Sequence, residues 1–292
     1  MNTTFWQGLK QNRGAVIGLV LITVFAFLAI FAGLIAPYDP SEIFEKSLRL
    51  KPFWQNQEAL QSPHLGVSHL LGTDDVGRDV LSRLLYGARV SLGIGTLVVL
   101  LSASFGTVIG LISGYYGGTV DAVIMRLVDI RMALPSVLLA IVVVTILGPG
   151  LSSTIIAVST ASMPSFIRLV RASVLAEKSK QYVQASQTFG ASAFRQMFIT
   201  ILPNCAAPLI VQSTLGFSDG ILDAAALGFL GLGAQPPTPE WGTMLADSRA
   251  FIESDPWLVT LPGLCILFVV LAFNLFGDGL RDALDPRLKR GQ

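Results

Sequence analysis

The sequence predicts an all-α, polytopic membrane protein with six transmembrane helices. Its 292 residues are 52% hydrophobic and only 13% charged, about half the charged fraction of an ordinary soluble domain. Several uncharged stretches are long enough to cross a bilayer, which takes about 20 mostly apolar residues. The composition also excludes an intrinsically disordered protein, because a chain this apolar would not stay solvated without folding. The net charge of +1 provides no field that would attract nucleic acid.

Six apolar segments follow one another along the chain. They span residues 15–36, 90–114, 130–147, 151–170, 208–232 and 257–277. The third and fourth segments come from one uncharged run, 132–167, which Gly148-Pro149-Gly150 divides because this tripeptide is typical of a turn. The first segment is longer than the roughly 7–15 apolar residues of a signal peptide, so we expect it to remain as an anchor.

The distribution of positive charge predicts the orientation of the six helices. With the N-terminus inside, the inner segments carry 13 of the 20 lysines and arginines, and six of the other seven lie in one long outer loop. Cytoplasmic segments carry the excess of Lys and Arg in membrane proteins, and long loops translocate with little regard to charge. We therefore expect both termini to be cytoplasmic.

Small residues recur every four positions in the second and fifth segments. The second has Ser102, Gly106, Gly110 and Gly114, and the fifth has Gly216 and Gly220 within a similar series. Such residues let helix backbones approach closely. The spacing favours packing within the chain, and the alternative is that the fifth segment lines a pathway facing a partner subunit.

The fifth segment also holds two carboxylates, Asp219 and Asp223, one helical turn apart. Carboxylates inside a membrane are costly and usually face a cavity, a partner or a pathway. Three interpretations are open. The carboxylates are hydrated near the outer end of the span, they pair with arginines of a neighbouring chain, or they belong to a proton relay. The last alternative would make the protein a proton-coupled carrier.

The sequence predicts no metal site and no catalytic site. The two histidines, His64 and His69, are five residues apart in the outer loop, where solvated side chains are expected more often than ligands. The two cysteines, Cys205 and Cys265, lie in or beside apolar segments and suit neither a disulfide framework nor a zinc site. No HExxH motif and no nucleophile with a neighbouring base occurs.

A polar inner segment, residues 171–203, is longer than a simple connection needs. Its pattern predicts a short amphipathic helix, a turn at Gly190 and a second helix that ends at Pro203. This segment is either a connector lying on the membrane surface or a docking helix for a cytoplasmic protein.

The order Gln184-Ala185-Ser186, then Gly190, then Leu202-Pro203 resembles the EAA loop of ABC-importer permeases. In that family Glu occupies the place of Gln184 and Ile the place of Thr200. The Gly-to-Pro spacing is intact, so the resemblance implies docking of an ATPase at these six residues. It does not imply that a carboxylate is needed at position 184.

A second resemblance covers essentially the whole chain. It rests on Leu71-Gly72-Thr73-Asp74-Asp75-Val76-Gly77-Arg78-Asp79 before the second span, and on Glu240-Trp241-Gly242 and Gly277-Asp278-Gly279-Leu280 further on. These motifs resemble the dipeptide/oligopeptide/nickel permease family, and within it the oligopeptide-C-like subgroup, the second permease subunit of dipeptide importers.

The resemblance implies an ABC importer type I transmembrane fold in the bacterial inner membrane. Residues 1–36 would form the cytoplasmic N-terminus and first helix, 37–88 a periplasmic loop, 89–280 the ABC transmembrane type-1 domain with its EAA-like loop 171–203, and 281–292 a cytoplasmic tail. The implied function is ATP-driven import of dipeptides or other small peptides. The candidates for the translocation pathway are Asp219, Asp223, Gly216 and Gly220 of the fifth segment.

The resemblance also implies the partners of the chain. These are a homologous second permease, two ATPase subunits, a periplasmic peptide-binding protein and membrane lipid. The sequence contains no Gly-Lys pair and therefore no P-loop, so ATP and Mg²⁺ would be bound by the partner subunits and this chain would not be an enzyme.

The binding protein is expected to dock near Asp74, Arg78, Asp79 and Arg83 in the outer loop. The alternative is that Asp79 and Arg83 form an i, i+4 pair that stabilises a helix by a few tenths of a kcal/mol.

Overall fold

The computed structural model describes residues 9–10, 12–55 and 69–284, and these form a bundle of α-helices without a named β-strand. The long helices are α2 (Arg13–Ile30), α4 (Val80–Tyr116), α5 (Gly118–Met132), α6 (Ser136–Leu147), α7 (Leu151–Lys178), α10 (Ala206–Phe229) and α12 (Trp257–Leu284). Shorter helices are α3 (Ala32–Ile35), α8 (Gln181–Thr188), α9 (Ala193–Arg195) and α11 (Trp241–Ser248). The all-α prediction is confirmed.

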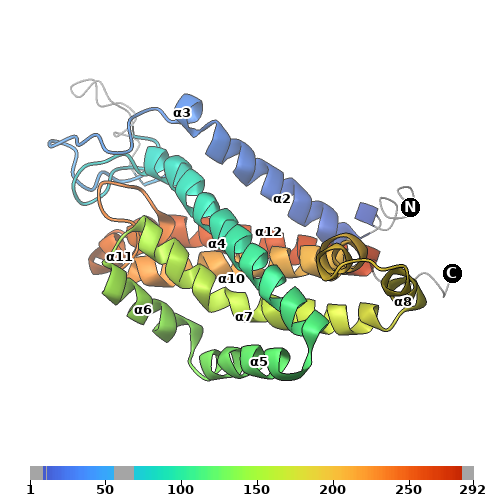
Figure 1. Ribbon diagram of the computed structural model, residues 1–292. Coiled ribbons are helices and arrows are strands. Elements are labelled where there is room, and N and C mark those ends of the chain that lie inside the picture. Colours follow the sequence, from blue (N-terminus) through green and yellow to red (C-terminus); the bar gives the residue numbers. More distant parts are fainter. Residues whose placement is uncertain (1–8, 11, 56–68, 285–292) are drawn as a thin grey trace.

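Figure 1 shows α11 and the loop before α4 at one end of the bundle and α8 at the other. The start of α2 and the end of α12 both lie at the α8 end, where the Asn12 side-chain amide donates to the Asp282 carboxylate at 3.1 Å. Because both ends of the described chain lie at the same end of the bundle, the chain passes along the bundle an even number of times.

Within the described residues, five helices are long and apolar enough to cross a membrane, and a sixth crossing results if the bent pair α5–α6 is one span. The segment predicted as the third span, 130–147, is not one continuous helix, because the chain bends by 92° between α5 and α6. Pro135 lies at this bend and disfavours a helical conformation of the residue before it. The 12 residues of α6 extend only about 18 Å, too short to cross the roughly 30 Å hydrocarbon layer alone.

Helix α4 begins ten residues before the predicted second span, and its 37 residues extend about 55 Å. Asp79 is its N-cap, and the Asp79 carboxylate accepts a 2.7 Å hydrogen bond from the Ser82 backbone N–H. Because this cap fixes the start of the helix in the outer loop, the first turns of α4 extend beyond the part that the sequence assigned to the membrane.

Helices α4 and α7 pack closely along the small residues of the second span. A Cβ on Gly106, Gly110 or Gly114 would lie 2.6–2.8 Å from the Cβ of Phe166, Val170 or Val174 on α7. The Ser102 hydroxyl donates to the Ser159 carbonyl at 2.9 Å. Packing within the chain, the favoured explanation of this spacing, is therefore confirmed for the second span.

Helices α2, α10 and α12 form the other side of the bundle. Gly18 of α2 lies against the backbone of α12, where an added Cβ would be 2.5 Å from the Ala272 carbonyl oxygen. Phe217 of α10 stacks on Phe273 of α12 with ring centroids 3.8 Å apart. These contacts fix α10 from one side and leave its α7-facing side available to line a cavity.

We expect Gly110→Ala to lower the free energy of unfolding by about 1–3 kcal/mol. The new Cβ would lie 2.8 Å from both the Ile167 carbonyl oxygen and the Val170 Cβ, so α4 and α7 must separate. The measurement is equilibrium unfolding of the purified chain in mild detergent.

Gly93→Ala in the same helix is the matched control, because a Cβ there meets nothing within 4 Å. Ala has the higher helix propensity, so this variant should be neutral or more stable by up to about 1 kcal/mol. Equal effects of the two substitutions would contradict close packing at Gly110.

Candidate translocation and coupling sites

The predicted docking segment begins with α8, which the structure holds firmly against the end of α7. Val183 is buried against Val174, Met197 and Ile201. Glu177 joins the two helices, because its carboxylate accepts hydrogen bonds from Lys180 at 2.6 Å and from the Tyr182 hydroxyl. Helix α8 is therefore attached to the bundle through one buried face and a set of polar contacts.

Partial burial and the hydrogen bond to Glu177 raise the pKa of Tyr182 to about 12. The Tyr182 hydroxyl therefore stays protonated at neutral pH and remains a donor to the Glu177 carboxylate. Tyr182 acts here as a fixed hydrogen-bond donor at the junction of α7 and α8.

The outward face of the docking segment is exposed. Gln184 and Ala185 are exposed and Ser186 is partly exposed. The Phe189 ring is 90% exposed, which is unusual for so large an apolar side chain. Gly190 has a φ of +78°, a conformation that favours glycine, and so forms the predicted turn.

The prediction that Pro203 ends the second helix is wrong. Residues Ala193–Phe229 form one long helical path through a π-helix at Gln196–Ile201 and a 3₁₀ turn at Leu202–Cys205. Pro203 lies in the first turn of the 3₁₀ segment, where its missing N–H is tolerated. The Asn204 amide donates to the Thr200 carbonyl at 2.9 Å and satisfies one acceptor in this irregular turn.

At the other end of the bundle, the four predicted docking residues of the outer loop are buried. Asp74 and Arg78 are each 8% exposed, Arg83 is 3% exposed and Asp79 is fully buried. The docking of a binding protein near these residues stays a prediction, but their own side chains are engaged within this chain.

Arg83 pairs with Asp74 and not, as the i, i+4 alternative has it, with Asp79. Its Nε lies 3.5 Å from the Asp74 carboxylate, which also binds Arg78 at 2.6 Å. The Arg83 guanidinium donates further to the carbonyls of Pro40 and Pro237. Arg83 therefore links the start of α4 to three separate outer segments, which contain Pro40, Asp74 and Pro237.

The Asp79 carboxylate binds His69, which corrects the expectation of a solvated histidine. The His69 Nδ1 lies 2.8 Å from Asp79, and the ring packs against both Tyr38 and Phe44 with centroid distances of 4.9 Å. The other histidine, His64, lies outside the described residues. Within the described part of the chain, no group of three or more His, Cys, Asp or Glu side chains could hold a metal ion.

Glu240 and Trp241 carry a structural role that sequence reasoning did not assign. The buried Glu240 carboxylate caps α11 by accepting from the backbone N–H groups of Gly242 and Thr243 at 2.8 and 2.9 Å. The fully buried Trp241 donates from its indole N–H to the Leu84 carbonyl of α4. The loop that follows α10 is thereby fixed on α4.

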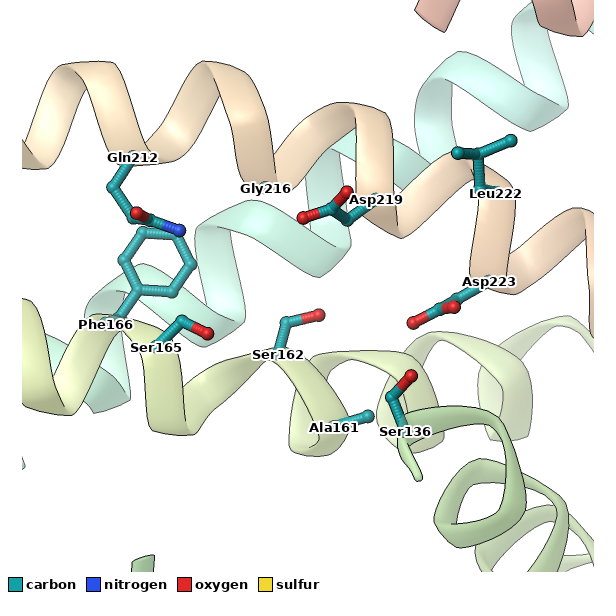
Figure 2. A pocket seen from close by; sticks show the side chains of 10 residues that line it. All are labelled: Ser136, Ala161, Ser162, Ser165, Phe166, Gln212, Gly216, Asp219, Leu222 and Asp223. Carbon is teal, nitrogen blue, oxygen red and sulfur yellow. The ribbon is translucent and has the colours of Figure 1, made fainter. Parts of the chain in front are cut away.

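A polar cavity of about 310 Å³ lies between α7 and α10 within the membrane-spanning part of the bundle. Figure 2 shows Asp219 and Asp223 on the α10 wall, with their carboxylates directed toward the serines of the opposite wall. The residues that line the cavity are Ser136, Ala161, Ser162, Ser165, Phe166, Gln212, Gly216, Asp219, Leu222 and Asp223.

Three of the four predicted pathway residues, Asp219, Asp223 and Gly216, thus line one cavity. The fourth, Gly220, packs instead against α4, where an added Cβ would lie 3.0 Å from a Val98 methyl group. The sequence analysis missed Ser162 and Ser165. Their spacing of three residues in an apolar span is a signal that could have found them.

Comparison with solved structures gives the class of protein. The fold is similar to two structures titled "Inward facing conformations of the MetNI methionine ABC transporter", each with a TM-score of 0.57 and 18% sequence identity. The similarity covers 70% of this chain and 97–98% of those chains. At this identity it concerns the fold alone, which is that of an ABC importer transmembrane subunit of type I. The predicted fold class is confirmed.

Residues 106–290 match the family described as "Binding-protein-dependent transport system inner membrane component", and residues 3–58 match the "N-terminal TM domain of oligopeptide transport permease C". The chain belongs to the family of binding-protein-dependent transport system inner membrane components. The resemblance inferred from the motifs is therefore confirmed, and the chain is a permease rather than an enzyme.

Three relatives match over nearly the full chain. The dipeptide transport system permease protein DppC of Escherichia coli is 59% identical to this chain, and the match covers 98% of this chain and 93% of the relative. The protein of the same name from Haemophilus influenzae is 55% identical, and the match covers 98% of this chain and 95% of the relative. The glutathione transport system permease protein GsiD of E. coli is 42% identical over 98% of this chain and 90% of the relative.

We expect Arg83→Leu to lower the free energy of unfolding by about 3 kcal/mol. The substitution leaves the buried Asp74 carboxylate with one cation instead of two and removes the donor to two carbonyls. Equilibrium unfolding in detergent measures this loss.

Arg49→Ala is the control, because Arg49 makes an outer ion pair with Asp255 but has a half-exposed side chain. Its loss should cost about 1 kcal/mol or less. If Arg83→Leu is no more harmful than Arg49→Ala, the Asp74–Arg83 contact does not hold the outer loop.

Proposed function

We propose that this chain is a transmembrane subunit of an ATP-driven importer that carries dipeptides across the bacterial inner membrane. The observation that carries the proposal is full-length similarity to dipeptide permeases, at 55–59% identity over 98% of the chain. The identity to a glutathione permease is lower, at 42%. This difference favours dipeptides over glutathione as the substrate.

The proposed partners are a homologous second permease, two ATPase subunits that bind ATP and Mg²⁺, and a periplasmic peptide-binding protein. The ATPase would meet this chain at α8 and the Gly190 turn, on an exposed face that includes Gln184 and Phe189. Because the end of α7 carries α8, movement of the ATPase would reach the membrane-spanning helices directly.

The proposed topology places α8 and both chain ends in the cytoplasm and α11 in the periplasm. The excess of Lys and Arg at the α8 end supports this orientation. The binding protein would then dock on the outer surface that Asp74, Arg78, Asp79 and Arg83 hold in place. Nothing in the family match or the relatives supports a proton-coupled carrier.

Uptake of a labelled dipeptide tests the proposal. Vesicles that hold the complete complex should accumulate the dipeptide when ATP and loaded binding protein are supplied, and an uncoupler should not change the rate. Uptake that needs a proton gradient but no ATP would contradict the proposal.

We expect Gly190→Asp to uncouple ATP hydrolysis from uptake. The variant places a negative charge and a β-carbon at the turn that faces the ATPase, and it leaves the packing unchanged because a Cβ there meets nothing within 4 Å. ATP hydrolysis and dipeptide uptake are measured in the same vesicles, and the uptake per ATP should fall at least about tenfold, equivalent to 1.4 kcal/mol.

Gly118→Asp is the matched control for this prediction. Gly118 also has a positive φ, +52°, and open space around its Cβ, but it belongs to the α4–α5 turn. Normal transport by Gly190→Asp, or equal loss in both variants, would show that the ATPase does not meet this chain at Gly190.

A further inference from the structure

The cavity between α7 and α10 has two chemically different walls. Asp219 and Asp223 supply carboxylates from α10, and Ser162 and Ser165 supply hydroxyl groups from α7, with Ser136 at the start of α6 (Figure 2). Hydroxyl groups accept hydrogen bonds as well as donating them, and carboxylates only accept. The cavity is therefore rich in acceptors directed toward one space.

The two carboxylates lack a positive partner in the part of the chain that the structure describes. None of the residues lining the cavity is Lys, Arg or His, and neither Asp219 nor Asp223 forms a salt bridge with a described residue. An unpaired carboxylate within a membrane is costly. A ligand that carries a positive charge and several N–H donors would satisfy both walls at once.

A second cavity, of about 350 Å³, lies next to the first one, toward the start of α10. The two cavities share Gln212, and the second is also lined by Pro208 of α10 and by Arg281 of α12. Pro208, Gln212, Gly216, Asp219 and Asp223 follow one another every three or four residues and so lie on one face of α10. This face of α10 is therefore a candidate route for a peptide, with carboxylates in one cavity and the Arg281 guanidinium in the other.

The charges at the two ends of this route match the two ends of a zwitterionic peptide. Asp219 and Pro208 are 11 residues apart in sequence, which corresponds to about 16 Å along the helix. An extended dipeptide spans only about 7 Å. One dipeptide cannot bind at both ends simultaneously, so the carboxylates and Arg281 would contact it at different stages of its passage.

From these observations we infer that Asp219 and Asp223 form a transit subsite for the α-ammonium group of the peptide, with the hydroxyl groups of Ser162 and Ser165 on the opposite wall. The inference rests on the proposed function and adds to it the group of the substrate that this chain recognises. The inference involves no proton transfer, because it needs the carboxylates only as hydrogen-bond acceptors for the ammonium group.

The test compares two substrates that differ only in the ammonium group. Vesicles holding the complete complex receive binding protein saturated with either Ala-Phe or propionyl-phenylalanine, which lacks the amino group. Saturation is established for each ligand by a binding measurement on the binding protein. In the double variant Asp219→Asn/Asp223→Asn, uptake of Ala-Phe should fall at least about tenfold, a loss typical of hydrogen bonds to charged groups.

Uptake of propionyl-phenylalanine should remain within about twofold of the unmodified complex, because this ligand makes no contact through an ammonium group. Ser218→Ala is the matched control on α10. Its hydroxyl donates to the Val270 carbonyl of α12, away from the cavity, so both substrates should be transported normally.

Three results would overturn the inference. The double variant could transport Ala-Phe normally, it could lose both substrates equally, or it could fail to copurify with the other subunits. The last result would assign the carboxylates to contacts between subunits rather than to the peptide. A failure of the unmodified complex to transport Ala-Phe would instead contradict the proposed function, so the two failures are distinguishable.

Discussion

The close approach of α4 and α7 is the contact on which the rest of the structure depends. Gly106, Gly110 and Gly114 allow the two backbones to meet over about two helical turns. In a bilayer the hydrophobic effect does not drive helices together, so this contact relies on packing between complementary surfaces. It fixes α7, and α7 in turn contacts both candidate sites, the polar cavity and the docking segment that begins with α8.

Helix α7 connects the polar cavity to the docking segment that begins with α8. Ser162 and Ser165 face the cavity near the middle of α7, and Glu177 near its end holds Lys180 and Tyr182 at the start of α8. The Tyr115 hydroxyl of α4 also donates to Gln196 in the segment that follows α8. Under the proposed function, a displacement of α8 would be transmitted along α7 to one wall of the cavity.

The features that could be predicted from the sequence depend on hydrophobicity and on local spacing. The spans, the small-residue contact between α4 and α7, and the turn at Gly190 are of this kind. The bend at Pro135 follows from a local rule too, but the apolar character of 130–147 concealed it. The burial of His69 and the pairing of Arg83 with Asp74 could not be predicted, since they depend on which distant segments meet in the fold. The cavity could be predicted only in part, because the serines opposite Asp219 and Asp223 belong to another helix.

The most direct test of this account measures whether α7 and α8 move as one body. Spin labels at the exposed positions Ser152, near the outer end of α7, and Gln187 of α8 would lie on either side of most of α7, whose 28 residues extend about 42 Å, a length within the range of pulsed electron resonance. The account predicts that this separation in the complete complex stays constant, within about 2 Å, when ATP and loaded binding protein are added. A change of about 5 Å, the pitch of one helical turn, would contradict it, because α8 would then move independently of the cavity wall.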